Sequence, residues 1–148
     1  MNFSKTTEYA FRILSYMAMD EKKLYISRDI HNDLQIPFRY LRKQLTSLSK
    51  SELIHSVQGK NGGYMISKPL EDISLFDIMI AIGDNNLESS CFFGFQACAL
   101  KEKCTMHTKW ALIIKNIKDV LSTTSLAELK ESGPHSFISN NNLLFTKN

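Results

Sequence analysis

The apolar positions near the start of this chain recur at helical spacing. In residues 6–19, two adjacent rows of apolar side chains at four-residue intervals predict an amphipathic helix with one buried stripe. The rows are Tyr9, Ile13, Met17 and Ala10, Leu14, Ala18. Thr6 or Thr7 is the expected N-cap of this helix. The triplet 24–26 predicts a short strand, and residues 75–82 predict an apolar helix capped by Ser74.

Two short helices separated by a proline follow the first strand. Ser27 is expected to cap a helix over residues 28–34. Pro37 is expected to start the next helix, over 38–50, because proline disfavours helix at the residue before it and suits a first turn. The expected core face of that helix is Phe38, Leu41, Leu45 and Leu48, and its expected free face is Arg39, Arg42, Lys43, Thr46 and Lys50. Two short helices joined by a tight break, with basic residues on the free face of the second, predict a helix-turn-helix.

A glycine-rich hairpin is predicted directly after the third helix. Two β-prone segments, 53–57 and 64–67, flank the sequence Gln-Gly-Lys-Asn-Gly-Gly of residues 58–63. A hairpin in this position is the wing of a winged helix. The glycines of the tip are expected to let the backbone approach phosphate closely, and Lys60 to supply charge there.

The charge of the chain is concentrated in the same region. Residues 38–68 hold six Lys and Arg against one acid, while the rest of the chain has 12 basic and 14 acidic residues. A basic block in an otherwise slightly acidic chain predicts a polyanionic partner, although an ordinary solvated helix face is the alternative. Arg39 or Arg42 is expected to read guanine, and the lysines to touch phosphate. The expected DNA-binding residues are Ser27, Arg28, Arg39, Tyr40, Arg42, Lys43, Lys50, Gly59 and Lys60.

A cluster of cysteines provides the second candidate site. All three cysteines, Cys91, Cys98 and Cys104, fall within fourteen residues, and His107 follows the last by three. Thiolates and imidazole are ligands of soft and borderline metals, and four of them can close a site. In a reducing compartment an odd number of clustered cysteines favours a metal or redox site over disulfides or three unrelated thiols. The spacing alone leaves an iron–sulfur cluster and a Cys3His zinc site open.

Several classes of protein are disfavoured by the sequence. No window reaches the ~18 uninterrupted apolar residues of a membrane span, and Glu8 and Arg12 interrupt any signal-peptide-like run. We therefore expect a cytoplasmic protein without membrane attachment. Residues 59–63 lack the spacing of a phosphate-binding loop, and no catalytic serine–histidine or paired-carboxylate arrangement is apparent. We expect a binding protein and not an enzyme, with a small redox protein as the less favoured alternative.

The residues after the cysteines predict a long helix over 107–121. Its apolar side is too large for a lone appended helix, so we expect it to pack on a second subunit. The side chains of that face are Trp110, Ile113, Ile114, Ile117, Val120 and Leu121. A short helical turn is expected at 125–129 and a disordered tail after it.

The expected fold class is mainly α with a small β-hairpin wing, a winged helix-turn-helix domain plus a long dimerisation helix. Its expected parts are the winged domain (1–83), a cysteine-rich cluster-binding loop (84–106), the dimerisation helix with its short turn (107–130), and the tail (131–148).

Over roughly residues 1–130 the chain resembles a known family of winged-helix iron–sulfur transcription regulators, which includes IscR and NsrR. The resemblance rests on residues 6–10, on the wing sequence 57–64, and on the cysteines with His107 and Trp110. It implies a homodimer, crossed through the long helix, that binds a partly palindromic double-stranded DNA operator. It further implies a repressor whose operator binding is controlled by a cluster sensing iron–sulfur status, redox or nitric oxide.

The resemblance also suggests how a cluster would be held. The Cys104-x-x-His107 spacing with Trp110 is similar to IscR, in which three cysteines and that histidine hold a 2Fe–2S cluster. The six-residue gap between Cys91 and Cys98 departs from the five of IscR, and the wing tip is similar to that of NsrR. NsrR-type proteins can complete a 4Fe–4S site with an acidic residue of the partner's first helix, and Glu8 is at the matching position. A 2Fe–2S cluster is therefore favoured and a 4Fe–4S cluster is the alternative. The signal, the operator and the form that binds DNA more tightly are left open.

Overall fold

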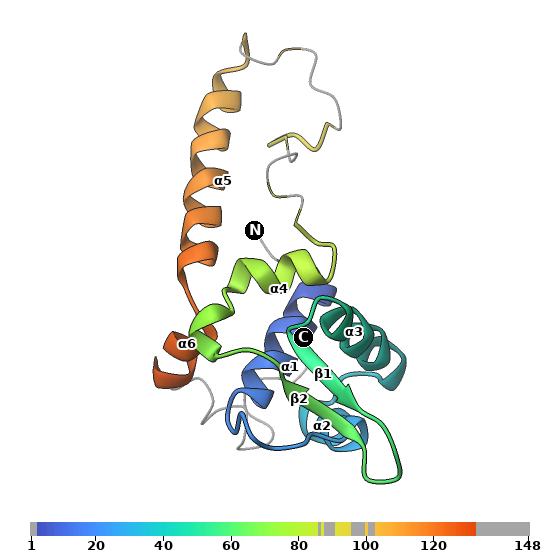
Figure 1. Cartoon of the computed structure of the whole chain (residues 1–148). Helices are drawn as coiled ribbons and strands as arrows, with labels where there is room; N and C mark the ends of the chain where they lie inside the picture. The colour runs from blue at the N-terminus through green and yellow to red at the C-terminus, as the bar shows by residue number, and fades with distance from the viewer. Residues whose placement is uncertain (1–2, 86, 88–90, 96–99, 101–102, 133–148) are drawn as a thin grey trace.

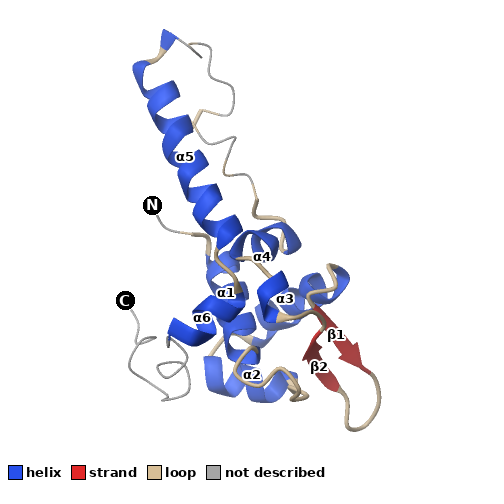
Figure 2. Ribbon diagram, turned by 60° about the vertical axis from the view of Figure 1, so that its left-hand side comes forward, coloured by secondary structure: helices blue, strands red, loops and turns tan. Residues whose placement is uncertain are grey.

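The fold is that of a winged helix with a long helix attached. The structure, a computed structural model, describes residues 3–85, 87, 91–95, 100 and 103–132. Figures 1 and 2 show α5 rising from a group formed by the other helices and the hairpin. The elements are α1 (Lys5–Met17), α2 (Ser27–Leu34), α3 (Phe38–Lys50), β1 (Ile54–Val57), β2 (Gly63–Ile66), the 3-10 helix η1 (Leu70–Asp72), α4 (Leu75–Ala81), α5 (Thr105–Thr123) and α6 (Leu126–Ser132). The predicted fold class, mainly α with a small β-hairpin wing, is confirmed, and the dimerisation role of the long helix stays a prediction.

The first helix begins earlier than the sequence predicted. Ser4 is its N-cap, and the Ser4 hydroxyl accepts a hydrogen bond from the backbone N–H of Thr7. The prediction that Thr6 or Thr7 caps the helix was therefore wrong. Thr7 is fully buried, and its hydroxyl donates a hydrogen bond to the Asp84 carboxylate instead.

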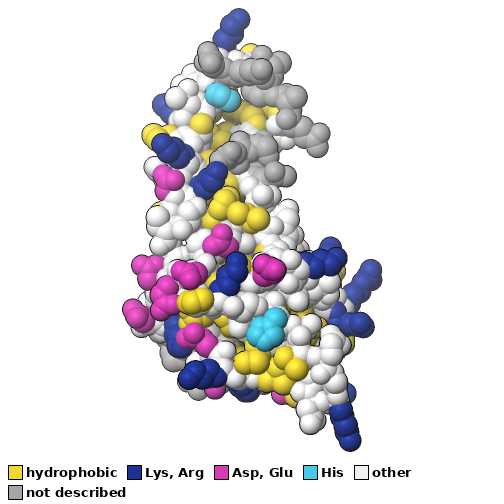
Figure 3. Space-filling view, viewed as in Figure 1, with side chains coloured by type: hydrophobic (Ala, Val, Ile, Leu, Met, Phe, Trp, Pro, Cys, Tyr) yellow, Lys and Arg dark blue, Asp and Glu magenta, His cyan; other side chains and the backbone are white. Residues whose placement is uncertain are grey.

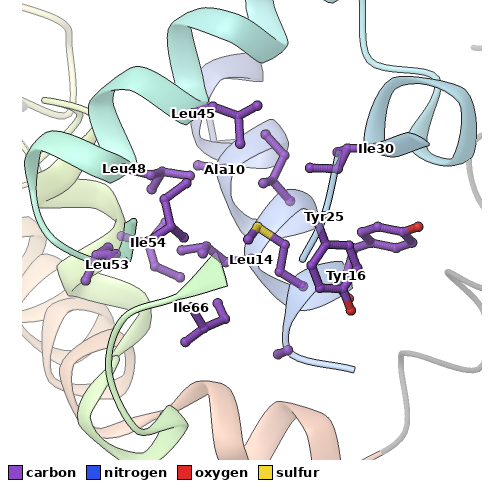
Figure 4. Close-up of a cluster of buried hydrophobic side chains, with 14 of the residues drawn as sticks. Ala10, Leu14, Tyr16, Tyr25, Ile30, Leu45, Leu48, Leu53, Ile54 and Ile66 are labelled. Carbon is purple, nitrogen blue, oxygen red and sulfur yellow. The ribbon is translucent and has the colours of Figure 1, made fainter. Parts of the chain in front are cut away.

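The core lies between α1, α3 and the hairpin, as Figure 4 shows for one part of it. The buried stripe of α1 is confirmed, since Ile13, Leu14 and Met17 are all 0% exposed. From α3, three of the four predicted core residues are buried, but Phe38 is 42% exposed. Phe38 is the first residue of α3, a full turn before the part of the helix that faces the core. Its prediction as a core residue was wrong. The buried residues of α3 are Leu41, Gln44, Leu45 and Leu48.

The helix-turn-helix has the predicted break but a different start. Ser27 is the first residue of α2 and not its N-cap, which is Ile26 and makes no side-chain cap hydrogen bond. The prediction that Ser27 caps this helix was wrong. At the other end Gln35 adopts a left-handed conformation with φ of 53°. This residue reverses the chain before Pro37, which is the N-cap of α3.

The hairpin pairs β1 with β2 in antiparallel register, from Ile54 opposite Ile66 to Val57 opposite Gly63. The strand predicted at 24–26 is reduced to one bridge, in which Tyr25 and Tyr64 exchange two backbone hydrogen bonds of 2.8 Å. A Cβ at Gly63 would lie 2.6 Å from the Tyr25 carbonyl oxygen, so glycine is needed for this close approach.

The end of the described chain returns to the winged domain. Ser74 caps α4 as predicted and forms a capping box with Asp77. After α5, Leu126 is fully buried in the core, and its backbone N–H donates to the Ile73 carbonyl at 2.9 Å. The division of the chain into domains stays a prediction, but α6 packs with the winged core and lies against η1 and α1.

Within the described residues, no helix is both long enough and apolar enough to cross a membrane. Of the predicted tail (131–148), the first two residues belong to α6, so the prediction of disorder was wrong for them, and residues 133–148 lie outside the described part of the chain.

Candidate nucleic-acid interface and metal centre

The basic residues of α3 share one exposed side of the helix. Arg39, Arg42, Lys43 and Lys50 are all exposed, while the leucines of the same helix face the core. This division follows from the helical period, which puts residues three and four apart on one face. In Figure 3, Lys and Arg side chains gather beside α3 and a basic side chain projects at the hairpin tip, whereas Asp and Glu gather on the opposite side of the molecule around α6.

Two aromatic side chains lie beside these cations. Tyr40 is 54% exposed, and its ring lies 6.2 Å from the ring of Tyr9 on α1. Phe38 meets the imidazole of His31 edge-on, with ring centroids 5.7 Å apart. No role was predicted for His31, although its Nδ1 lies 2.6 Å from the Ile36 carbonyl oxygen. Since a carbonyl can only accept, this nitrogen carries the proton.

Contacts between α1 and α2 fix the first helix of the pair. The Tyr16 hydroxyl donates to the Asp33 carboxylate, and the Arg12 guanidinium donates to the Leu34 carbonyl at the end of α2. Burial, and then the hydrogen bond to Asp33, raise the pKa of Tyr16, while burial lowers the pKa of Arg12. These contacts could not be predicted from the sequence, because helical periodicity predicts apolar faces and not polar pairs across them. Ser27 is half-buried and Arg28 exposed at the start of α2.

The glycines of the wing have different structural roles. Gly59 has φ of +116°, and no heavy atom lies within 4 Å of the place where a Cβ would be. Its backbone is therefore open to a partner, and the neighbouring Lys60 is exposed. A Cβ on Gly62 would lie only 2.2 Å from the Val57 carbonyl oxygen. Gly62 thus closes the hairpin, so only Gly59 keeps the open backbone expected for phosphate contact.

The predicted metal ligands are placed only in part. Cys91 is half-buried, Cys104 is the N-cap of α5, and His107 is exposed in the first turn of that helix. The His107 N–H donates to the Cys104 carbonyl at 3.0 Å, which makes these two residues neighbours on one turn. Cys98 lies outside the described residues. Among the residues that are described, no three His, Cys, Asp or Glu side chains form a group that could hold a metal.

The alternative ligand Glu8 is half-buried in the first turn of α1. There its carboxylate pairs with Lys5 of the same helix at 2.6 Å.

Aromatic contacts hold the start of the cysteine region against α5. The ring of Phe92, which follows Cys91, lies edge-on to Trp110 with centroids 5.4 Å apart. Trp110 is one helical turn beyond His107. The contact therefore places Phe92, the neighbour of Cys91, beside the helical turn that follows His107. The donor chemistry of the residues fits an iron–sulfur or zinc centre. In the described part of the site, the aromatic contact holds the Cys91 segment to α5, but the four predicted ligands are not seen together around one centre.

A second contact ties the beginning of this region to α1. The Asp84 carboxylate accepts hydrogen bonds from the hydroxyls of both Ser4 and Thr7 at the start of α1. The negative charge therefore sits at the positive end of the helix dipole. Asp84 is the first residue of the predicted loop 84–106, and this contact could not be predicted from the sequence, since nothing local distinguishes it from any turn aspartate.

Comparison with known proteins gives a consistent assignment. Residues 3–132 match the Rrf2 family, described as "Iron-dependent Transcriptional regulator". The HTH-type transcriptional regulator NsrR of Oceanobacillus iheyensis is 30% identical over 108 residues, covering 72% of this chain and 74% of that protein. The HTH-type transcriptional regulator IscR of Erwinia tasmaniensis is 31% identical over 101 residues, covering 68% and 61%.

Among solved structures the chain is similar to CymR, the global cysteine regulator of B. subtilis, with a TM-score of 0.76. The match covers 89% of this chain and 98% of that one at 20% identity, which supports the winged-helix fold. The predicted resemblance to the IscR and NsrR group is confirmed. The chain belongs to the Rrf2 family of transcriptional regulators.

Proposed function

We propose that this regulator is a dimeric repressor whose binding to a partly palindromic operator is controlled by an iron–sulfur cluster. DNA binding by a winged helix follows from the family and the fold. The cluster, the dimer, the identity of the contacting residues and a cytoplasmic site of action are our inferences. The relatives are named as transcriptional regulators, so we assign a binding function and no catalytic one.

The main observation in support of the proposed DNA interface is the exposed basic side of α3 next to the open wing tip. A recognition helix enters the major groove with its first turns, where Arg39 and Arg42 stand exposed. Arginine can bind guanine in a bidentate manner, while lysines act as point charges toward phosphate. The proposed contacts are Ser27, Arg28, Arg39, Tyr40, Arg42, Lys43, Lys50, Gly59 and Lys60.

The dimer is supported by the apolar side chains that α5 leaves uncovered. Leu112, Ile113 and Val120 are 60%, 44% and 61% exposed, while Ile114 and Leu121 are buried against the rest of the chain. A helix that is apolar on more than one side usually has a second partner. A second copy crossed through α5 would place two recognition helices about 34 Å apart, one turn of DNA.

The proposed cluster ligands are Cys91, Cys98, Cys104 and His107, with a 2Fe–2S cluster favoured and a 4Fe–4S cluster completed through Glu8 as the alternative. Such a cluster would supply a centre sensitive to iron supply, oxidants or nitric oxide. The chain's own part is to hold Cys104 and His107 on one helical turn and the Cys91 segment against Trp110. Control of DNA binding requires two arrangements of the chain that differ in operator affinity.

A regulator of the same fold that holds zinc, or no metal, is the second candidate. The Cys3His donor set also satisfies zinc. The similarity of fold to CymR, named as a cysteine regulator, shows that this architecture is not restricted to proteins named as iron-dependent.

Operator binding and cluster binding are separable by mutation. The double variant Arg39→Ala with Arg42→Ala should lose operator binding by at least about thirtyfold, since each bidentate arginine contributes about 1–3 kcal/mol. Visible absorption should be unchanged. The variant Lys22→Ala with Lys23→Ala removes two exposed cations away from α3 and serves as the matched control. Unchanged DNA affinity in the arginine variant would refute the placement of the recognition helix.

Anaerobic purification with a visible spectrum and a count of iron and sulfide per chain tests the cluster. Coloured protein containing sulfide supports the proposal, whereas colourless protein containing zinc supports the second candidate. If changing Cys91, Cys98 and Cys104 to Ala leaves operator binding and its response to oxidants unaltered, cluster control is refuted.

A further inference from the structure

The exposed position of Phe38 is not explained by the core. It is 42% exposed, whereas Leu41, Leu45 and Leu48 of the same helix are 0% exposed. As the first residue of α3 it occupies the end of the recognition helix that contacts base edges in helix-turn-helix proteins. An apolar ring therefore stands where, on the proposed function, the protein reads DNA.

The ring of Phe38 is held in place from behind. The imidazole of His31 meets it at an interplanar angle of 89°, with centroids 5.7 Å apart. His31 is itself fixed, because its Nδ1–H donates to the carbonyl of the fully buried Ile36 at 2.6 Å. The orientation of Phe38 is thus set by α2 and the turn, so little conformational freedom is lost when a partner covers the ring.

A single exposed apolar side chain is common on protein surfaces and needs no explanation by itself. Phe38 differs because of its neighbours. Arg42 lies four residues on, in the same row of the helix, and Arg39 is adjacent; both are exposed. The apolar group that distinguishes base pairs in the major groove is the C5-methyl of thymine, and phenylalanine is among the side chains that contact it.

We infer that Phe38 is a specificity-determining residue that reads the methyl group of a thymine in each half of the operator. Side chains four residues apart on a helix are about 5–6 Å apart at Cβ. Base pairs rise about 3.4 Å per step. The thymine should therefore lie within about two base pairs of the base contacted by Arg42. This inference rests on the proposed DNA interface and adds a base preference to it.

The test removes single methyl groups from DNA. A preferred duplex is first selected from random sequences with the full-length protein, and each thymine is then replaced by deoxyuridine, which pairs identically but lacks the methyl. For the wild type we expect about a fourfold rise in Kd at one thymine in each half-site, the factor that corresponds to one buried carbon group. Phe38→Ala should bind the original duplex more weakly and lose nothing further on that replacement.

Two controls separate recognition from a structural role. Phe38→Leu keeps an apolar side chain and should retain the methyl effect, and Tyr40→Ala should retain it in full. Independently of any variant, 5-iododeoxyuridine at the critical position should photocrosslink to Phe38 in the wild type. The inference is overturned if each replacement of thymine by deoxyuridine raises the Kd of Phe38→Ala by the same factor as that of the wild type, and if the crosslink maps to a residue other than Phe38. A wild-type chain that enriches no sequence would overturn the proposed function and this inference with it.

Discussion

Replacing Asp84 tests how the cysteine-rich region is attached to the winged domain. In Asp84→Ala the hydroxyl of Thr7, which is 0% exposed, loses the carboxylate that accepts its hydrogen bond. Hydrogen bonds to charged groups contribute about 1.5–3 kcal/mol. The second bond, from Ser4, is exposed and adds little. We therefore expect the free energy of unfolding to fall by about 1.5–3 kcal/mol, or about 3–12 °C in Tm for a chain of this size.

Thermal and urea unfolding followed by circular dichroism measure this loss. The protein concentration must be fixed, because the stability of an oligomer depends on it. Asp84→Asn keeps one oxygen acceptor and should lose less, and Thr7→Val keeps the shape while removing the hydroxyl. In a double-mutant cycle Thr7→Val and Asp84→Ala should couple by at least about 1 kcal/mol. Losses that simply add, or a Tm that does not change in Asp84→Ala, would show that the bond stabilises nothing.

Three further changes test other parts of the structure. Gly62→Ala places a Cβ 2.2 Å from the Val57 carbonyl oxygen. The free energy of unfolding should therefore fall by about 1–3 kcal/mol, and operator affinity should fall with it. Unaltered binding in a mobility-shift assay would exclude the wing from the interface. Lys60→Gln should lower the slope of log Kd against log salt by about two for the dimer, one for each subunit, with Lys22→Gln as the unaffected control. Because burial and Asp33 raise the pKa of Tyr16 in the folded state, its stabilising effect is complete below the unfolded pKa of about 10 and is lost as the pH rises above it. Urea unfolding between pH 8 and 11 should show a smaller alkaline loss in Tyr16→Phe; an identical loss would refute the assignment.

The sequence predicted those elements whose apolar residues keep a regular period. The stripe of α1 and the leucines of α3 are buried as expected, since a helix of 13 residues repeats its buried face several times. The hairpin was recognisable from its glycines. The wing and the basic face of α3 were therefore accessible from sequence alone.

The errors occurred at the ends of elements, where periodicity gives little information. Phe38 fits the spacing of the core residues, but the first turn of α3 projects past the core, and the ring of His31 meets Phe38 there edge-on. Ser4 caps α1 in place of the threonines because Thr7 is turned inward toward Asp84, a residue 77 positions away. Such a distant partner leaves no local signal. Gln44, which sits buried among the leucines of α3, gave none either.

The candidate metal centre was predictable in its chemistry but not in its geometry. Cysteine clustering and the Cys104-x-x-His107 spacing identify the donors, and the latter pair does share one helical turn. The contact between Phe92 and Trp110 was not foreseen, because aromatic pairing across a loop depends on the tertiary path of the chain.

The return of α6 to the winged core affects how the protein can be dissected. Leu126 contributes a fully enclosed side chain, and the backbones of Leu75 and Thr124 are bonded at 3.0 Å beside the Ser74–Ser125 bridge. A fragment cut at residue 83 would therefore leave a hole where Leu126 belongs and expose Ile73. Such a fragment is a poor surrogate for the DNA-binding unit. The C-terminal end of α5 is anchored to the winged domain by these contacts. A rotation of α5 at its other end, where Cys104 lies, would therefore also move the winged domain.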